Sequence, residues 1–323
     1  MKGTVLMTSC MVLTPIVAPI SVNAQHVDYH LYQDRNAFEQ NQTLLIDVAR
    51  QHLTKQQVIN LLMHVDPNKF PMVELHLTDD QGCSLQSNVL GNRASDTVFD
   101  QQALSQILQV AKQRGLTIIP DVDVPSHCTA IINQLKQINS PWLRKGIVMN
   151  DGCLDYTNPN TYEFVHKLYQ PVIHVFKNQN IRLFNVGCDE VPGNVRCGDQ
   201  LADFLNQIDH QLNHNGFAMI VWNDSLQTAY PTLSRNILID HWNNTGASIN
   251  ALQRAGFDVK RVDPNANYLN LENVHNRQLV THKLDNFNDQ AQGGKLLALW
   301  GGNDDVTPHQ LQLLVEHVQR KVN

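Results

Sequence analysis

The chain alternates between short, nearly continuous apolar runs and longer segments in which apolar residues recur every three or four positions. A short apolar run flanked by polar residues is typical of a parallel strand that is buried on both faces. The sequence contains eight such runs, and a polar residue or glycine lies at or next to the carboxyl end of each: 44–50, 73–80, 116–124, 181–190, 218–224, 237–243, 257–263 and 295–301.

The segments between these runs carry the spacing of amphipathic helices. Thr54 precedes a stretch whose apolar residues share one helical face, which predicts a helix that begins with a threonine cap. Gly115, Gly216 and Gly256 each stand just before a predicted strand, where a helix would end in a left-handed residue.

Eight strands alternating with helices predict an α/β protein, a single (β/α)8 TIM barrel that occupies residues 25–323. A doubly wound open sheet is the alternative, but no glycine-rich phosphate loop follows the first predicted strand. Residues 25–42 are expected to lead into the first strand, and residues 125–180 to form one expanded loop and a helix.

Residues 1–24 are typical of an export signal. Lys2 precedes an apolar stretch from Met11 to Val22, and Val22 and Ala24 occupy the positions where signal peptidase prefers small residues. The apolar stretch is too short for a membrane span, and two prolines interrupt it. We therefore expect a secreted or cell-surface protein without a membrane span. A frayed apolar start of a cytosolic protein is the alternative.

Composition narrows the class of protein further. Of the 323 residues, 42% are hydrophobic, and the 24 Lys and Arg against 30 Asp and Glu give a net charge of −6. The chain is therefore globular, and without a basic stripe nucleic acid is excluded as a partner. The five cysteines after the signal form neither a disulfide framework nor a C-x-x-C zinc pair, although up to two bridges are possible: Cys83, Cys128, Cys153, Cys188 and Cys197.

In such a barrel the chemistry lies at the carboxyl ends of the strands. Those ends carry one arginine, several acids, a histidine and three of the four tryptophans: Arg50, Asp79, Asp80, Asp121, Asp123, His127, Asp189, Glu190, Trp222, Asp224, Asp240, Trp242 and Trp300. Aromatic faces stack on sugar rings, whereas carboxylates and guanidinium groups bind sugar hydroxyls. The ends therefore predict a carbohydrate pocket, and tryptophans packed in the core are the alternative.

A metal hydrolase is a second alternative. His76, Asp79, Asp121, Asp123 and His127 offer nitrogen and oxygen ligands that suit zinc. Such sites usually need several histidines at strand ends. Because alternate strand residues face opposite sides, His76 is expected to point away from a pocket that Asp79 enters. We therefore expect no metal and no cofactor.

Glycoside hydrolysis needs a carboxylic acid that protonates the leaving oxygen. Glutamate occurs at six positions, and only Glu190 ends a predicted strand. Asp189 directly precedes it, so the two do not match a pair of opposed carboxylates on either side of a bond. They fit better a pair in which one carboxylate holds a substrate group and the other moves the proton.

The run Asn185-Val186-Gly187-Cys188-Asp189-Glu190 resembles the His-x-Gly-Gly-Asp-Glu signature of glycoside hydrolase family 20, the β-N-acetylhexosaminidases. Further segments match motifs of that family in its order, over about residues 44–302: Leu45–Arg50, Glu74–Gly82, Pro120–His127, Trp222–Asp224, Tyr268-Leu269 and Leu299–Gly301. The chain is most similar to the compact, dispersin-like members, which the resemblance links to poly-β-1,6-N-acetylglucosamine.

The resemblance implies retaining hydrolysis in which the acetamide of the substrate is the nucleophile. Asp189 and Tyr268 would orient the acetamide, and Glu190 would be general acid and then general base. His127 and Asp79 would form a relay behind the acid. The resemblance further implies a set of residues that bind the sugar: Arg50, Trp222, Asp224, Trp242, Trp300 and Asn303.

The sequence departs from the family at Gly302, where a glutamate normally holds the 4- and 6-hydroxyls of the terminal sugar. That contact is absent or comes from Asn303, Asp304 or Asp305. We interpret the chain as a secreted, monomeric β-N-acetylglucosaminidase that acts on an oligo- or polysaccharide containing N-acetylglucosamine. The alternative from another class is an adhesin that binds carbohydrate in the same pocket with little turnover.

Overall fold

The computed structural model describes residues 22–322, except 94, 151, 193–197, 228, 272–274, 291–292 and 303–305. Its main sheet is parallel throughout and has nine strands: β1 (Thr43–Asp47), β2 (Met72–Thr78), β3 (Thr117–Val122), β6 (Leu183–Asn185), β7 (Ala218–Trp222), β8 (Leu238–His241), β9 (Val259–Arg261), β10 (Tyr268–Asn270) and β11 (Leu296–Trp300). The hydrogen-bonded order is β10-β11-β1-β2-β3-β6-β7-β8-β9.

The sheet is curled, because consecutive strands β9 and β10 form its two opposite edges. Only residues 262–267 connect these two strands, and so short a segment spans at most about 20 Å. Among the described residues no ladder joins β9 to β10. The predicted α/β barrel is confirmed, although this part of its wall is not closed by hydrogen bonds.

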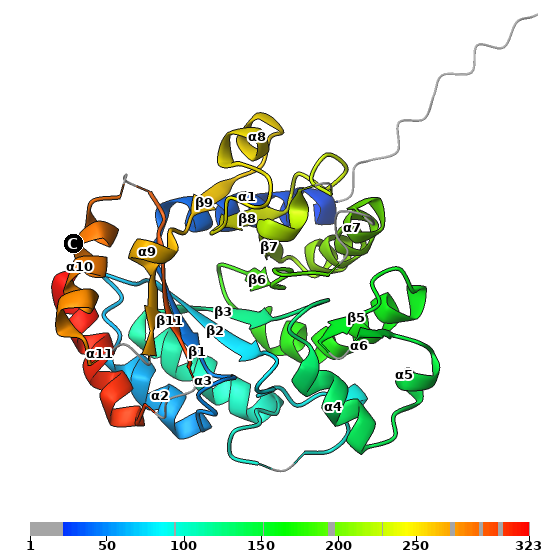
Figure 1. The fold of residues 1–323 in the computed structure, drawn as a ribbon, viewed down its shortest axis with the longest axis horizontal. Helices are drawn as coiled ribbons and strands as arrows, with labels where there is room; N and C mark the ends of the chain where they lie inside the picture. The colour runs from blue at the N-terminus through cyan, green and yellow to red at the C-terminus, as the bar shows by residue number, and fades with distance from the viewer. Residues whose placement is uncertain are drawn as a thin grey trace, which may run out of the picture.

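Helices cover the outside of the curled sheet (Figure 1). In the order in which they contact one another, they are α10 (Arg277–Asn288), α11 (Pro308–Lys321), α2 (Lys55–His64), α3 (Gln101–Arg114), α6 (Pro159–Phe176) and α7 (Gly198–His214). Outward-facing strand residues such as Leu44, Ile46 and Val73 are fully buried beneath them. None of the helices in the described part of the chain has the length and apolar character that a bilayer crossing requires.

The inside of the barrel is layered. At the amino ends of the strands, an apolar floor packs against Ala37 and Phe38 of α1 (Val22–Gln40): Met72, Ile119, Leu183, Ala218, Ile220 and Leu238. Above this floor lie four polar residues, each at most 4% exposed: Glu74, Asn185, Asp240 and Lys260. Burial raises the pKa of Asp240 to about 6, although the nearby Lys260 ammonium opposes the rise.

Several expectations about local structure are confirmed. Thr54 caps α2 in a capping box with Gln57, and Gly115, Gly216 and Gly256 all have left-handed backbone, with φ of 76°, 80° and 94°. Free thiols are recorded at the four described cysteines of the predicted mature chain: Cys83, Cys128, Cys153 and Cys188. Cys10, Cys197 and most of the predicted export signal lie outside the described residues.

Other expectations were wrong in detail. The ninth strand, β10, was not among the predicted strands, because its residues Tyr268–Asn270 do not belong to a longer apolar run like those that identified the others. The lead-in segment 25–42 contains most of a helix, α1, which crosses the amino end of the barrel and contacts α7, β7 and β9. The segment 125–180 holds more than a loop and a helix: α4 (Thr129–Gln137), α5 (Pro141–Arg144) and an antiparallel hairpin of β4 (Val148–Asn150) and β5 (Cys153–Leu154) precede α6.

Candidate active site

A cavity of about 280 Å³ opens at the carboxyl ends of the strands. This volume lies at the lower end of the range for small-molecule sites, about 300–1,000 Å³. Its wall brings together residues from one edge of the sheet, β10, through its middle to the end of β8: Arg50, His76, Asp123, His127, Asp189, Glu190, Trp222, Trp242, Tyr268, Asn270, Trp300, Gly301 and Gly302. Eight of these residues were predicted to belong to the site, and all eight line the same cavity.

Asp189 and Glu190 both line the cavity although they are adjacent in the chain. The strand that leads to them, β6, ends at Asn185, and the backbone then turns left-handed at Gly187, Cys188 and Glu190, with φ of 66°, 68° and 52°. On an extended strand their side chains would diverge. The left-handed residues redirect both carboxylates to the same side.

The two carboxylates differ in their surroundings. The Asp189 side chain is 23% exposed, and its Oδ1 is buried without a hydrogen-bond partner among the described residues. An unpartnered buried acceptor is costly, so this oxygen is a ready acceptor for a donor on a bound molecule. The Glu190 side chain is 62% exposed, which leaves its carboxyl group accessible to a leaving group and to water.

Asp224 supports Glu190 from behind and does not line the cavity. Its Oδ2 accepts a hydrogen bond from the Glu190 backbone N–H at 2.7 Å, and its Oδ1 accepts one from Trp242 Nε1 at 3.0 Å. Burial, together with the charge of Asp189, raises the pKa of Asp224 to about 6. Asp224 was predicted to bind the sugar, but in the structure it instead holds Glu190 and the Trp242 ring in place.

His127 lies between the two catalytic candidates and a second pair of acids. Its Nε2 faces Asp189 Oδ2 at 3.5 Å and Glu190 Oε2 at 3.6 Å, while its Nδ1 is 3.1 Å from Asp80 Oδ2. Asp79, the predicted relay partner, is farther away, with Oδ2 at 3.9 Å from Nδ1. Burial would lower the pKa of His127, but hydrogen bonding to Asp189 and Asp80 outweighs burial and raises it to about 12.

Arg50 is held by two carboxylates at one side of the cavity. Its Nη1 donates to Asp47 Oδ2 at 2.9 Å, and its Nη2 lies 2.6 Å from Asp79 Oδ2. Asp47 Oδ2 also accepts the Gly301 N–H at 2.8 Å, and a Cβ on Gly301 would approach Arg50 Cβ to 2.6 Å. The guanidinium is thus fixed beside the cavity, with donors suited to hydroxyl groups.

Aromatic rings form the opposite part of the wall. Trp242 stacks on Tyr268 with ring centroids 6.2 Å apart, and Tyr268 meets Trp300 edge-on at 5.7 Å. Trp222 lies 6.4 Å from Trp300, whose ring also carries the Arg50 guanidinium at 5.1 Å. Burial and neighbouring aspartates such as Asp189 raise the pKa of Tyr268 well above its usual value, so its hydroxyl stays a hydrogen-bond donor.

The expectation that His76 points away from the pocket is wrong. His76 lines the cavity, and its Nε2 is 3.2 Å from Asp79 Oδ2. The pairing of β2 with β3 shifts register between His76 and Thr78, and the strand ends at Thr78. Strict alternation therefore fails before Asp79, and both side chains reach the same region.

The sequence also missed two residues as parts of a sugar site. His76 was weighed only as a metal ligand, and Asn270 was not singled out. Asn270 lies two positions after Tyr268 on β10, so the two side chains share a face, and that spacing could have identified it. Asn303, the remaining predicted sugar ligand, lies outside the described residues, as do Asp304 and Asp305.

Among the residues that the structure describes, two sets of side chains have the spacing of a metal site. They are His76, Asp79 and Asp123, and Asp79, Asp80 and His127, with candidate ligand atoms within 4.8 Å of one another in each set. Asp79 belongs to both sets, and its Oδ2 already lies 2.6 Å from the Arg50 guanidinium. A cation bound there would have to compete with this ion pair.

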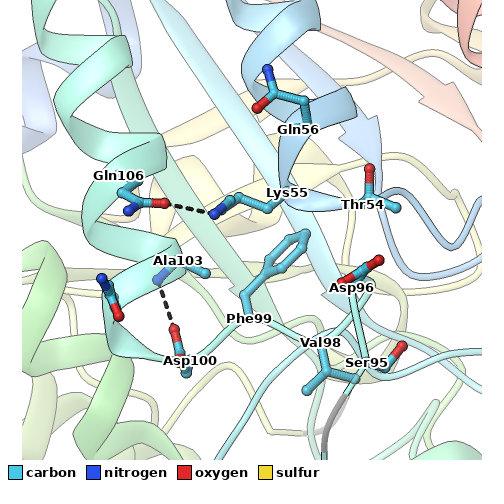
Figure 2. A pocket seen from close by; sticks show the side chains of 11 residues that line it. Thr54, Lys55, Gln56, Ser95, Asp96, Val98, Phe99, Asp100, Ala103 and Gln106 are labelled. Atoms are coloured by element: carbon cyan, nitrogen blue, oxygen red, sulfur yellow. Dashed lines mark hydrogen bonds between the residues drawn. The ribbon is translucent and has the colours of Figure 1, made fainter.

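A larger cavity, about 510 Å³, lies between the amino ends of α2 and α3 (Figure 2). Its polar groups bond to one another: Lys55 Nζ donates to Gln106 Oε1 at 2.7 Å, and Asp100 accepts the Ala103 N–H. None of the predicted site residues lines it. The chemistry of the protein therefore belongs to the smaller cavity at the strand ends.

The smaller cavity can bind a polar ring and transfer a proton. Arg50 supplies donors for hydroxyls, the aromatic wall supplies faces for stacking, and Glu190 is an accessible carboxyl group. Asp189 offers an unpartnered acceptor beside it. An accessible acid next to a second carboxylate is the smallest set of catalytic groups that glycosidic bond cleavage requires.

Comparisons with known proteins agree with this geometry. In fold, the chain is similar to dispersin B, with a TM-score of 0.76 and 19% identity over 87% of this chain and 98% of that chain. In sequence, it is 25% identical over 264 residues to a β-hexosaminidase of Vibrio furnissii and 26% identical over 282 residues to β-hexosaminidase subunit A2 of Dictyostelium discoideum.

These two alignments cover 67% and 77% of this chain but only 42% and 49% of the relatives, so the chain spans less than half the length of these relatives. The family model for the catalytic domain of glycosyl hydrolase family 20 matches residues 42–300, from the start of β1 to the end of β11. Because that match takes in the whole sheet and every described residue of the cavity wall up to Trp300, the chain belongs to glycosyl hydrolase family 20.

Proposed function

We propose that this protein is a secreted, retaining β-N-acetylglucosaminidase that cleaves poly-β-1,6-N-acetylglucosamine or a related β-linked glycan. The observation that carries the proposal is the pairing of Asp189, with its buried unpartnered Oδ1, and the accessible Glu190 in one cavity of roughly one sugar's size. Family membership supports the reaction type. The compact fold shared with dispersin B supports the choice of substrate.

The reaction proceeds in two steps on the substrate's own acetamide. In the first step the acetamide oxygen attacks the anomeric carbon, the glycosidic bond breaks, and Glu190 gives its proton to the leaving oxygen. Asp189 accepts the acetamide N–H and stabilises the positive charge of the oxazolinium that forms, while the Tyr268 hydroxyl donates to the acetamide oxygen. The oxazolinium takes the place of the covalent glycosyl-enzyme intermediate that other retaining glycosidases form.

In the second step Glu190 takes a proton from water, and the water oxygen attacks the anomeric carbon and reopens the oxazolinium. Two inversions at one carbon retain the configuration. His127, positively charged near neutral pH, lies 3.6 Å from Glu190 Oε2 and 3.5 Å from Asp189 Oδ2, so it orients both carboxylates. Asp80 holds the other ring nitrogen of His127.

The proposal is tested by release of nitrophenol from 4-nitrophenyl β-N-acetylglucosaminide, beside a β-1,6-N-acetylglucosamine oligomer whose products are resolved by length. Turnover of both substrates is expected, with no turnover of the matching β-glucoside, which lacks the acetamide. Efficient glucoside hydrolysis would contradict the acetamide mechanism. Binding without turnover of either N-acetylglucosaminide would favour the adhesin alternative, and loss of activity with a chelator would favour a metal mechanism.

A further inference from the structure

His76 is almost completely buried beneath the cavity, with a side chain that is 3% exposed. Its Nδ1 is 2.6 Å from Asp121 Oδ2, and its Nε2 is 3.2 Å from Asp79 Oδ2. An ionised carboxylate can only accept hydrogen bonds, so two such partners require that both ring nitrogens carry a proton. The geometry therefore describes an imidazolium held between two aspartates.

The Asp79 oxygen that faces His76 is the one that holds Arg50. Asp79 Oδ2 lies 2.6 Å from Arg50 Nη2 and 3.2 Å from His76 Nε2, whereas Asp79 Oδ1 accepts only the Gln81 N–H, at 3.3 Å. The position of this oxygen is thus fixed from one side by His76 and from the other by Arg50. Arg50 in turn lines the sugar cavity, while Asp79 does not.

His76 has no polar atom left for a substrate, because both ring nitrogens are engaged by aspartates. A third acid, Asp123, has its Oδ2 3.9 Å from Nε2 and adds attraction without a hydrogen bond. Any polar influence of His76 on the reaction must therefore pass through the aspartates that it holds, although its ring also meets Trp300 edge-on with centroids 5.2 Å apart.

We propose, on the basis of the function proposed above, that His76 is a positioning residue for substrate binding, which fixes Asp79 and through it the Arg50 guanidinium that binds the sugar hydroxyls. The Asp121–His76–Asp79–Arg50 chain runs from the barrel interior to the cavity wall. It comes closest to the His127 contacts that reach Glu190 at Asp79 Oδ2, which lies 3.9 Å from His127 Nδ1, beyond hydrogen-bonding distance.

The consequence is a selective effect on binding. His76→Gln keeps one amide donor but removes the charge and the second hydrogen bond. The KM for 4-nitrophenyl β-N-acetylglucosaminide is expected to rise about 10- to 100-fold, the usual range for loss of a charge-assisted contact, while kcat changes less than about 3-fold. The dissociation constant of free N-acetylglucosamine, followed by tryptophan fluorescence, is expected to rise in parallel.

A matched control and a double-mutant cycle separate this role from general loss of structure. His241 is also a buried histidine at a strand end but does not line the cavity, so His241→Gln should leave KM within about 2-fold of wild type. In an Arg50→Ala background, His76→Gln should raise KM by less than about 3-fold further, because the residue through which it acts is gone.

The proposal is overturned if His76→Gln lowers kcat with KM unchanged, or if its effect on KM is the same with and without Arg50. If His76→Gln does not fold, Asp121→Asn decides: it keeps an acceptor for Nδ1 but removes the charge, and an unchanged KM contradicts the proposal. Absence of turnover and binding in the wild-type protein would instead refute the proposed function, so the two failures are distinguishable.

Discussion

Asp224→Asn is the perturbation whose effects on activity and on stability should separate most clearly. The Asp224 carboxylate accepts from the Glu190 backbone N–H and from Trp242 Nε1 at once. An asparagine amide has a single acceptor oxygen, so it can serve only one of these donors and presents its own N–H group to the other. One anchor of either the acid or the aromatic wall is therefore lost.

The effect on stability should depend on pH. The pKa of Asp224 rises from 3.8 to about 6 on folding, mainly by burial, and this net rise already includes the effect of its two hydrogen bonds. An acid whose pKa is raised by folding destabilises the folded protein increasingly from about pH 4 to pH 6 and by a constant amount, here about 3 kcal/mol, above that. The asparagine side chain of the variant carries no charge at any of these pH values, so Asp224→Asn is not subject to this destabilisation.

We therefore expect the free energy of unfolding of Asp224→Asn to exceed that of wild type by up to about 3 kcal/mol at pH 8, and to lie within about 1 kcal/mol of wild type at pH 4, where the wild-type carboxyl group is itself protonated. Its kcat should fall about 10- to 100-fold, because a misplaced acid loses its alignment with the leaving oxygen. The loss should be smaller for nitrophenyl substrates, which need little protonation.

Urea unfolding at the two pH values and kinetics with activated and unactivated substrates measure both effects. Asp203→Asn, at an exposed position on α7, is the control for loss of one negative charge. The reasoning fails if Asp224→Asn is less stable than wild type at pH 8, or if kcat is unchanged for both substrates.

Three further substitutions test other parts of the molecule. Glu190→Gln should lower turnover about 10²–10⁴-fold, less for good leaving groups, and equal losses for good and poor leaving groups would exclude Glu190 as the acid. Gly302→Glu should improve kcat/KM on small aryl substrates and suppress internal cuts, as product lengths would show; no change would mean that another residue already binds those hydroxyls. Asp34 is fully buried on α1 with its pKa raised by burial to about 7, so wild-type thermal stability should fall from about pH 4 to pH 7. Asp34→Asn should make that fall smaller, because Asp224 and Asp240 also contribute to it, and an unchanged pH profile would contradict the pKa shift of Asp34.

The sequence was sufficient to predict the barrel and most of the cavity because these depend on features that are local in the chain. Buried strands are continuous apolar runs, and the residue that follows each run lies at the carboxyl edge of the sheet. Arg50 and Trp300 follow from that rule, because parallel strands share one edge. Asp189 and Glu190 also follow a predicted strand, but they reach the cavity together only through the left-handed backbone between Gly187 and Glu190.

What the sequence could not supply depends on backbone geometry beyond the strand ends. Whether Asp79 or Asp80 meets His127, and whether His76 points inward, is decided by the register shift next to Thr78. That Asp224 faces Glu190 rather than the cavity depends on contacts between residues 34 positions apart. Neither is encoded in alternation of polar and apolar residues.

The segment from Gly187 to Glu190 shows why the site costs stability. A side chain at Gly187 would place its Cβ 2.1 Å from Asp123 Oδ1, so only glycine fits there. Cys188 and Glu190 nevertheless carry side chains at φ of 68° and 52°, a conformation that costs a residue other than glycine about 1–2 kcal/mol. These two left-handed residues lower the stability of the fold. Without them, however, Asp189 and Glu190 would point to opposite sides of the sheet. The strained backbone is thus the physical reason that two adjacent acids can act on one bound sugar.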